Sequence, residues 1–306
     1  MTRQLTYHIS EKDAGMKLEV FLKQHGFSRH ILTHLKRTEN GICVNGIWAY
    51  TSHILRASDI LTILLVEEAS SEQIVPINLP FPIVYEDEDL MVINKPADMP
   101  IHPSINNYEN TLANAAAWYF QQKNEAFVYR CINRLDRDTT GLLILAKHML
   151  SGAILSRMSA AREIHREYLA IAEGCVPACG IIDAPIARKE DSAIERCIDF
   201  EQGERAVTHF SRISYAEGYS LVSLKLETGR THQIRVHMKH LGHSLPGDYL
   251  YNPDFSKIKR QALHSYRLKF SHPISGKPME FTAPVPNDFR TFACVCSEPH
   301  PHADNG

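Results

Sequence analysis

The chain has 306 residues, of which 44% are hydrophobic and 22% are charged. This length and composition predict a globular protein with a full core that divides into more than one domain. No apolar stretch is long enough to span a bilayer and the N-terminal residues lack the apolar core of a secretory signal, so we expect a cytoplasmic protein with no membrane partner. The seven cysteines lack the spacing of a secreted framework, and we expect reduced thiols.

The net charge of -2 does not by itself suggest a nucleic-acid-binding protein, because phosphate contacts call for a basic surface. The charge is unevenly distributed along the chain, however. Residues 1–66 carry +3, residues 67–106 carry -7, and the remaining residues carry +2. An acidic segment therefore masks two mildly basic ones, which leaves room for an RNA-binding surface.

The first segment is predicted to be a small α/β unit. Residues 17–22 and 31–35 have the apolar spacing of helices, and short strands are expected around residues 42–46, where Asn45-Gly46 is a strong hairpin signal. Its basic side chains could form a binding face or simply a solvated helical surface. Over residues 14–66 the pattern resembles the small RNA-binding domain of the ribosomal-protein type that occurs fused to RNA-modifying enzymes. We therefore expect a small RNA-binding domain at residues 1–66.

Residues 67–80 are polar, acidic and then proline-bearing, as expected of a linker. Beyond them an α+β domain is expected at residues 81–290, with a large mixed, mainly antiparallel sheet flanked by helices and loops. The strands are predicted at residues 83–85, 90–94, 141–145, 168–172 and 220–226, and the helices at residues 110–123 and 150–162. Residues 291–306 are expected to be a poorly ordered tail.

The segment from residue 132 to residue 147 reads Ile-Asn-Arg-Leu-Asp-Arg-Asp-Thr-Thr-Gly-Leu-Leu-Ile-Leu-Ala-Lys, and it places Asp136 in a charged turn before an apolar strand. Such turns are common places for catalytic residues. Arg134 and Arg137 flank Asp136 and favour the charged carboxylate that a nucleophile or base requires. On these residues alone, a surface turn held by salt bridges is the better explanation of the pattern.

The full segment resembles the catalytic motif H-R-L-D-x-x-T-[ST]-G-x-x-x-x-A-K of the RluA-type pseudouridine synthases, which modify RNA. Asn133 departs from it, because histidine is usual there, and this puts the fine positioning of the turn in doubt. Further segments resemble the family in the expected order; they are Val84 to Pro96, Arg166-Glu167-Tyr168-Leu169-Ala170, Thr228 to His237, Gly247-Asp248, Arg260 to His264 and Phe281 to Pro284. The resemblance covers residues 82–288.

The resemblance implies an isomerase that detaches uracil from ribose, rotates it and rejoins it through carbon 5, without a cofactor or a metal. Asp136 would be the catalytic carboxylate, Arg235 would pair with it, and Tyr168 would lie against the uracil face. Ile234 would form an apolar wall, and the substrate-binding side chains would be Arg134, Lys147, Arg230 and His232. The carboxylate could attack ribose, attack uracil or assist an elimination. Ribosomal RNA is favoured as the partner over transfer RNA.

Two other hypotheses remain open at this stage. Asn133, Arg166 and the acidic net charge would also suit an RNA-binding assembly factor that has lost activity on the same fold. A metal-dependent hydrolase could use His232, His237, His240 and His243, but alternating residues on a strand would point these imidazoles apart. The cysteine spacings also miss the usual C-x-x-C pairs, so a metal site is not expected.

Overall fold

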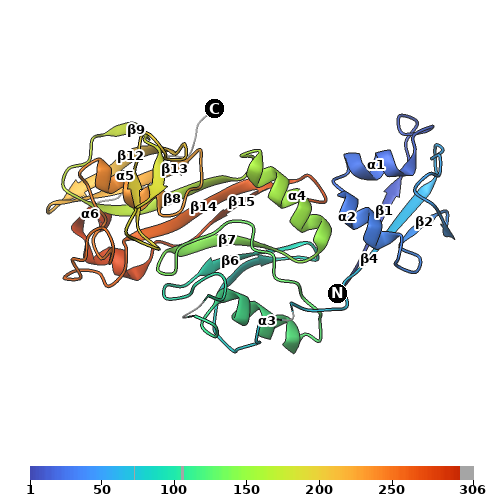
Figure 1. Ribbon diagram of the computed structural model, residues 1–306, viewed down its shortest axis with the longest axis horizontal. Coiled ribbons are helices and arrows are strands. Elements are labelled where there is room, and N and C mark those ends of the chain that lie inside the picture. Colours follow the sequence, from blue (N-terminus) through green and yellow to red (C-terminus); the bar gives the residue numbers. More distant parts are fainter. Residues whose placement is uncertain (72, 105–106, 297–306) are drawn as a thin grey trace.

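The protein is described from a computed structural model that covers residues 1–71, 73–104 and 107–296. Figure 1 shows two parts, a small N-terminal unit and a larger unit built on one long sheet. Within the described residues no helix combines the length and apolar character needed to cross a membrane.

The N-terminal unit is a four-stranded antiparallel sheet in the order β1-β4-β2-β3, covered by two short helices. Its elements are β1 (Thr2–His8), α1 (Leu18–Gln24), α2 (Arg29–Leu35), β2 (Ile42–Val44), β3 (Ile47–Trp48) and β4 (Ile60–Val66). Asn45 and Gly46 link β2 to β3 with φ values of 52° and 78°, as the predicted two-residue hairpin requires. β1 and β4 were not predicted, although Leu61, Ile63 and Leu65 alternate toward the core.

The larger unit contains a mixed sheet that has nine strands within the described residues. Its path is β5-β6-β7-β14-β8-β13-β12-β9, and β15 also pairs with β14. These strands are β5 (Ile83–Glu86), β6 (Leu90–Lys95), β7 (Thr140–Ala146), β8 (His165–Glu173), β9 (Cys179–Asp183), β12 (Val207–Ala216), β13 (Tyr219–Leu226), β14 (Leu263–Ser271) and β15 (Pro278–Thr282). A separate hairpin pairs β10 (Ile186–Arg188) with β11 (Arg196–Ile198). The predicted α+β fold with a mainly antiparallel sheet is confirmed.

Strands β7 and β14 run parallel at the centre of this sheet, and they meet at one short junction. Ser265 of β14 pairs with Gly141 of β7. A Cβ atom on Gly141 would lie 2.2 Å from the carbonyl oxygen of Ser265, and φ at this glycine is 109°. Glycine is therefore required here on two grounds, the backbone conformation and the close approach of the neighbouring strand.

Both faces of the sheet are covered, which explains the continuous apolar runs of β6 and β7. On one face Leu142 and Ile144 pack against α4 (Met149–Ala160) and the N-terminal unit. On the other face Leu143 and Leu145 pack near α3 (Leu112–Gln122). Both helices lie close to their predicted positions. The remaining helical elements are α5 (Gln233–His240), the 3-10 helix η1 (Asn287–Thr291) and α6 (Ala293–Cys296).

The N-terminal unit is fastened to the larger unit by buried and half-buried polar contacts. Arg3 of β1 donates two hydrogen bonds to Asp89, at 2.7 and 3.2 Å. Glu67, at the end of β4, accepts from the guanidinium of Arg130 and from the backbone amide of Met149. Apolar side chains of both units share one core cluster. The two units therefore form a continuous packed interface.

The predictions for the linker and for the C-terminal tail have different outcomes. Residues 67–80 contain no helix or strand within the described positions, and their backbone and side chains bond to the larger unit, as where Ser71 Oγ accepts from Tyr129 N at 3.0 Å. The prediction of a poorly ordered tail from residue 291 is wrong for residues 291–296. Phe292 and Cys294 are fully buried there, because they complete an apolar cluster with β8 and β13. Residues 297–306 of that predicted tail lie outside the described residues.

Candidate active site

The turn that carries Asp136 is anchored to the strand that follows it. Ile132 N donates to Ile144 O at 2.9 Å. The side chain of the buried Asn133 continues this pairing, because its Oδ1 accepts from Ile144 N at 2.9 Å and its Nδ2 donates to Leu142 O at 3.3 Å. The amide offers both a donor and an acceptor to β7. Asn133 therefore holds the turn in place.

Lys95, at the end of β6, also holds this turn through hydrogen bonds. Its side chain is completely buried, and Nζ donates to the carbonyl oxygens of Pro96, Met99 and Arg137 at 2.7, 3.0 and 2.7 Å. Arg137 directly follows Asp136 in the chain. Burial lowers the pKa of Lys95 to about 7, against the opposing charges of Asp138 and Asp136.

Replacing Lys95 by Met should make the protein less stable, by an amount that increases with pH. Because the pKa of Lys95 is lowered in the folded protein, the unfolded chain binds more protons at this position between about pH 7 and pH 10.5. The native protein thus gains stability from Lys95 as pH rises through that window, at up to about 1.4 kcal/mol per pH unit. Urea unfolding of both proteins at pH 7 and pH 9 measures this; an equal difference at both pH values would contradict it.

Arg235 joins Asp136 to a second carboxylate. Its Nη1 lies 2.8 Å from Asp136 Oδ2, while Nε and Nη2 bind the two oxygens of Asp248 at 2.7 Å each. The guanidinium also lies over the rings of Tyr249 and Tyr251. Burial by itself would lower the pKa of Arg235, but the two carboxylates outweigh it and raise that pKa. The pairing of Arg235 with Asp136 is therefore present, and Arg235 is rigidly aimed by Asp248.

Helix α5 supplies Arg235 and the apolar wall. We expected alternating residues on a strand here, and that expectation is wrong: residues 233–240 are helical. The helix follows His232, which adopts a left-handed conformation with φ of 57°. His232 Nδ1 lies 2.9 Å from the hydroxyl of Tyr251, and its Nε2 lies 4.0 Å from Asp136 Oδ2. Burial lowers the pKa of His232, so this imidazole is neutral at pH 7.

A pocket of about 510 Å³ opens over these groups. Asp136, Tyr168, Ile234 and Arg235 all line it, and Tyr168 extends from β8 with 4% of its surface exposed. Burial and the charge of Asp136 raise the pKa of Tyr168, whereas the charge of Arg166 opposes the rise. Tyr168 is consequently protonated at neutral pH. The three predicted catalytic residues thus lie around one cavity.

The predicted substrate-binding residues divide into two groups. Arg134, Arg230 and His232 line the pocket. Lys147 does not, and that prediction is wrong: its Nζ binds Glu86 Oε1 at 2.8 Å and Asp87 O at 2.6 Å. The seven residues of β7 lie between the catalytic turn and Lys147, and at about 3.3 Å per residue they carry it roughly 23 Å away.

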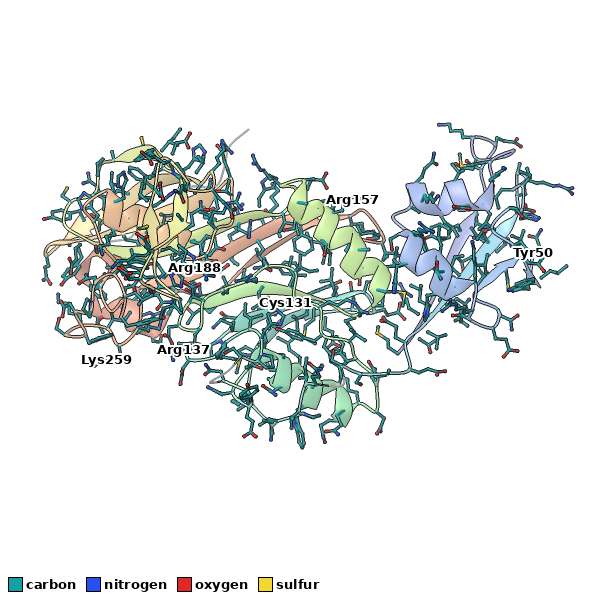
Figure 2. All side chains as sticks on the ribbon, in the orientation of Figure 1. Tyr50, Cys131, Arg137, Arg157, Arg188 and Lys259 are labelled. Atoms are coloured by element: carbon teal, nitrogen blue, oxygen red, sulfur yellow. The ribbon has the colours of Figure 1, made fainter. Side chains whose placement is uncertain are left out.

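The contacts of some charged residues near the site differ from those predicted or were not predicted. Arg137 pairs with Asp138 and Asp98, not with Asp136, and it lies at the edge of the larger unit (Figure 2). The role of Asp248 was not predicted, although the Gly247-Asp248 pair was noted as part of the resemblance. Arg162 and Arg166 also line the pocket.

The histidines considered above as metal ligands have separate hydrogen-bond partners. His237 bonds to Thr208 and to Ala184 O, and His243 bonds to Glu173 O. Within the described residues the group with metal-like spacing is a different one, Asp87, Asp89 and His272. These side chains already have protein partners, since Asp89 binds Arg3 and His148, and they do not line the pocket.

Known proteins with similar sequences identify the family. The model for RNA pseudouridylate synthases matches residues 89–240. An uncharacterized RNA pseudouridine synthase, YjbO, of Bacillus subtilis (strain 168) is 38% identical over 274 residues, which cover 89% of this chain and 96% of that protein. The chain belongs to the RNA pseudouridine synthase family. It is accordingly an isomerase that acts on RNA, and the RluA-type resemblance is confirmed.

Two further relatives extend this comparison. Ribosomal large subunit pseudouridine synthase D of Escherichia coli (strain K12) is 35% identical over 303 residues, covering 93% of this chain and 92% of that protein. Among solved structures, human RNA pseudouridylate synthase domain containing 1 aligns with a TM-score of 0.58 and 28% identity, over 70% of this chain and 87% of that one. Membership of this family of isomerases argues against the hypothesis of a metal-dependent hydrolase.

Proposed function

We propose that this enzyme converts uridine to pseudouridine in ribosomal RNA, with Asp136 as its catalytic carboxylate. The observation that carries the proposal is the position of Asp136, 27% exposed in the pocket and bound by the buried Arg235 at 2.8 Å. A charged carboxylate held in this way can react at ribose or uracil, or assist an elimination through ribose. The bond from ribose to N1 breaks, C5 forms the new bond, and the C5 proton is exchanged for one on N1.

Tyr168 and Ile234 suit the two sides of a uracil ring. Both are buried side chains at the pocket wall, and a tyrosine offers an aromatic face as well as a hydroxyl that can relay a proton. The target uridine has to leave the RNA stack before it can reach them, at a cost of a few kcal/mol that phosphate contacts offset. Arg134, Arg230 and His232 at the pocket are suited to such contacts with phosphate or ribose.

Replacing Tyr168 by Phe should separate stacking from proton transfer. The phenyl ring keeps the apolar face, so KM for RNA should change less than about threefold, while kcat falls by about 10²-fold or more because the hydroxyl is lost. Tritium release from RNA labelled at uracil C5 measures both constants. A normal kcat in the Phe variant would exclude the hydroxyl from the reaction.

Ribosomal RNA is proposed because several relatives over most of this chain are named as ribosomal large subunit enzymes. Mapping pseudouridine across total RNA from cells with and without the protein tests it. Loss of specific pseudouridines in ribosomal RNA is expected. Loss confined to transfer RNA would assign the enzyme to that substrate.

The N-terminal unit is proposed to contribute RNA binding through its basic side chains. Lys36 and Arg37 are exposed at the end of α2, and phosphate contacts of this kind weaken binding as salt increases. Converting both residues to Glu should lower RNA affinity and the salt dependence of binding without changing kcat. An unchanged affinity would confine RNA binding to the larger unit.

A further inference from the structure

The pocket contains more cationic groups than its own carboxylates neutralise. Arg134, Arg162, Arg166, Arg230 and Arg235 line it. Two of these arginines are already paired, since Arg235 binds Asp136 and Asp248 and Arg230 binds Glu204. Arg134, Arg162 and Arg166 make no ion pair within the described residues, and Glu227, the other acidic residue of the lining, binds Arg205 and His209. An excess of guanidinium groups around a cavity favours an anionic ligand.

Arg166 is the most informative of these arginines. It lies two residues before Tyr168 on β8, so both side chains extend from the same face of the strand. Its Nε is buried, and within the described part of the chain this atom has no hydrogen-bond partner. Arg166 as a whole is half-buried, but leaving a buried N–H donor without a hydrogen-bond partner is costly, which indicates that a ligand supplies the partner.

The Arg166 guanidinium lies next to the turn between β13 and α5. A Cβ atom built on Gly229 would lie 3.6 Å from both terminal nitrogens of Arg166. The charge of Arg166 also reaches Tyr168, where it opposes the rise in the tyrosine pKa caused by burial. The guanidinium is therefore next to this turn and within electrostatic reach of Tyr168.

Arg162 supplies a second, independent observation. It follows the C-cap residue Ala161 of α4 and adopts φ of 63°, where glycine is the usual residue. A side chain in this conformation costs about 1–2 kcal/mol. Its side chain is exposed and lines the pocket. Keeping arginine at such a position is consistent with a function for its side chain.

We infer that Arg162 and Arg166 form a phosphate clamp, which binds RNA phosphate groups next to the target uridine at the pocket lip formed by the end of α4 and the start of β8. This inference rests on the proposed function, because it takes the ligand to be a nucleotide within RNA. A phosphodiester supplies the anionic oxygens that the two guanidinium groups require. The clamp holds the flipped nucleotide's backbone while Tyr168 and Ile234 contact its base.

Binding is measured without turnover, in the Asp136→Asn background, with a stem-loop RNA that the wild-type enzyme modifies, or with total ribosomal RNA if it modifies none. Arg166→Gln and Arg162→Gly should each raise Kd by about tenfold and reduce the slope of log Kd against log salt by about one. Arg166→Lys should lose less affinity than Arg166→Gln, because it keeps the charge. Lys259→Gln is the matched control: Lys259, which Figure 2 labels on the larger unit, does not line the pocket, so losing its charge should leave Kd and slope unchanged.

A structural role for these arginines would give a different result. Arg162→Gly relieves the left-handed conformation and Arg166→Gln removes a buried N–H donor that has no partner, so the thermal midpoint of each variant should equal or exceed that of its parent. Reduced affinity with a lower midpoint in both variants would overturn the clamp, as would Kd and slope equal to those of the control. If the wild-type enzyme binds RNA through these arginines but forms no pseudouridine, the proposed function fails, while phosphate binding by the two arginines stands.

Discussion

Asp136→Asn should reduce turnover by at least about 10³-fold, or about 4 kcal/mol of transition-state stabilisation. The amide has the shape of the carboxylate, and its oxygen can still accept the hydrogen bond from Arg235, which lies 2.8 Å from Oδ2 in the native protein. The side chain then lacks the negative charge needed for attack or proton abstraction. The loss of turnover is measured as tritium release from RNA labelled at uracil C5, with EDTA present.

A nearby carboxylate provides the matched control for this substitution. Asp98 lies in an adjacent turn, its side chain is 78% exposed, and it makes a 3.7 Å ion pair with Arg137. It has φ of 54°, a conformation that asparagine tolerates well. Asp98→Asn should therefore keep kcat within about threefold of the wild type. Asp136→Asn should still bind RNA, and turnover within tenfold of the wild type would remove Asp136 from the catalytic role.

Arg235→Met should abolish activity and also destabilise the protein by about 3–5 kcal/mol, because it leaves a buried carboxylate without its partner. The side chain of Asp248 is 1% exposed and receives two bonds from Arg235 at 2.7 Å. Asp136 is more exposed than Asp248, so leaving Asp136 without Arg235 should destabilise the fold less and reduce the rate of the reaction more. Urea unfolding and tritium release measure the two consequences separately.

A double substitution separates these two consequences. Adding Asp248→Asn to Arg235→Met removes the buried charge, so part of the lost stability should return, while activity should stay absent because Asp136 is still unsupported. If the double variant is no more stable than Arg235→Met, burial of the Asp248 charge is not the cause. Activity returning in the double variant would contradict the role of Arg235 in holding Asp136.

The strands most easily predicted from sequence were those buried on both faces. β6 and β7 contain unbroken apolar runs, and their positions followed directly from them. β12 was missed because a register shift between Arg212 and Ser214 breaks its alternation. Short strands with mixed polarity, such as β9, carry little signal because their burial depends on neighbours far away in the chain.

The catalytic segment shows where sequence patterns mislead. In residues 233–240, Ile234, Val236 and Met238 alternate with polar residues as in a strand, yet they form α5. The helix buries its polar side chains as well, because Arg235 and His237 have partners in Asp248, Asp136, Thr208 and Ala184. Those partners come from other segments, so the hydrophobic pattern could not reveal them. Grouping Asp136, Tyr168 and Arg235 depended on family resemblance.

The parallel junction between β7 and β14 also determines when the site can exist. Asp136 precedes β7 and Tyr168 lies on β8, and these two strands are joined through β14, which the chain supplies about a hundred residues after Tyr168. Contacts between residues this far apart in the sequence form late, because the entropy cost of closing the loop comes before the contacts that compensate for it. In a chain that is still being synthesised, Asp136 and Tyr168 therefore do not come together until residue 271 has emerged. The enzyme accordingly cannot modify nearby uridines before its own synthesis is nearly complete.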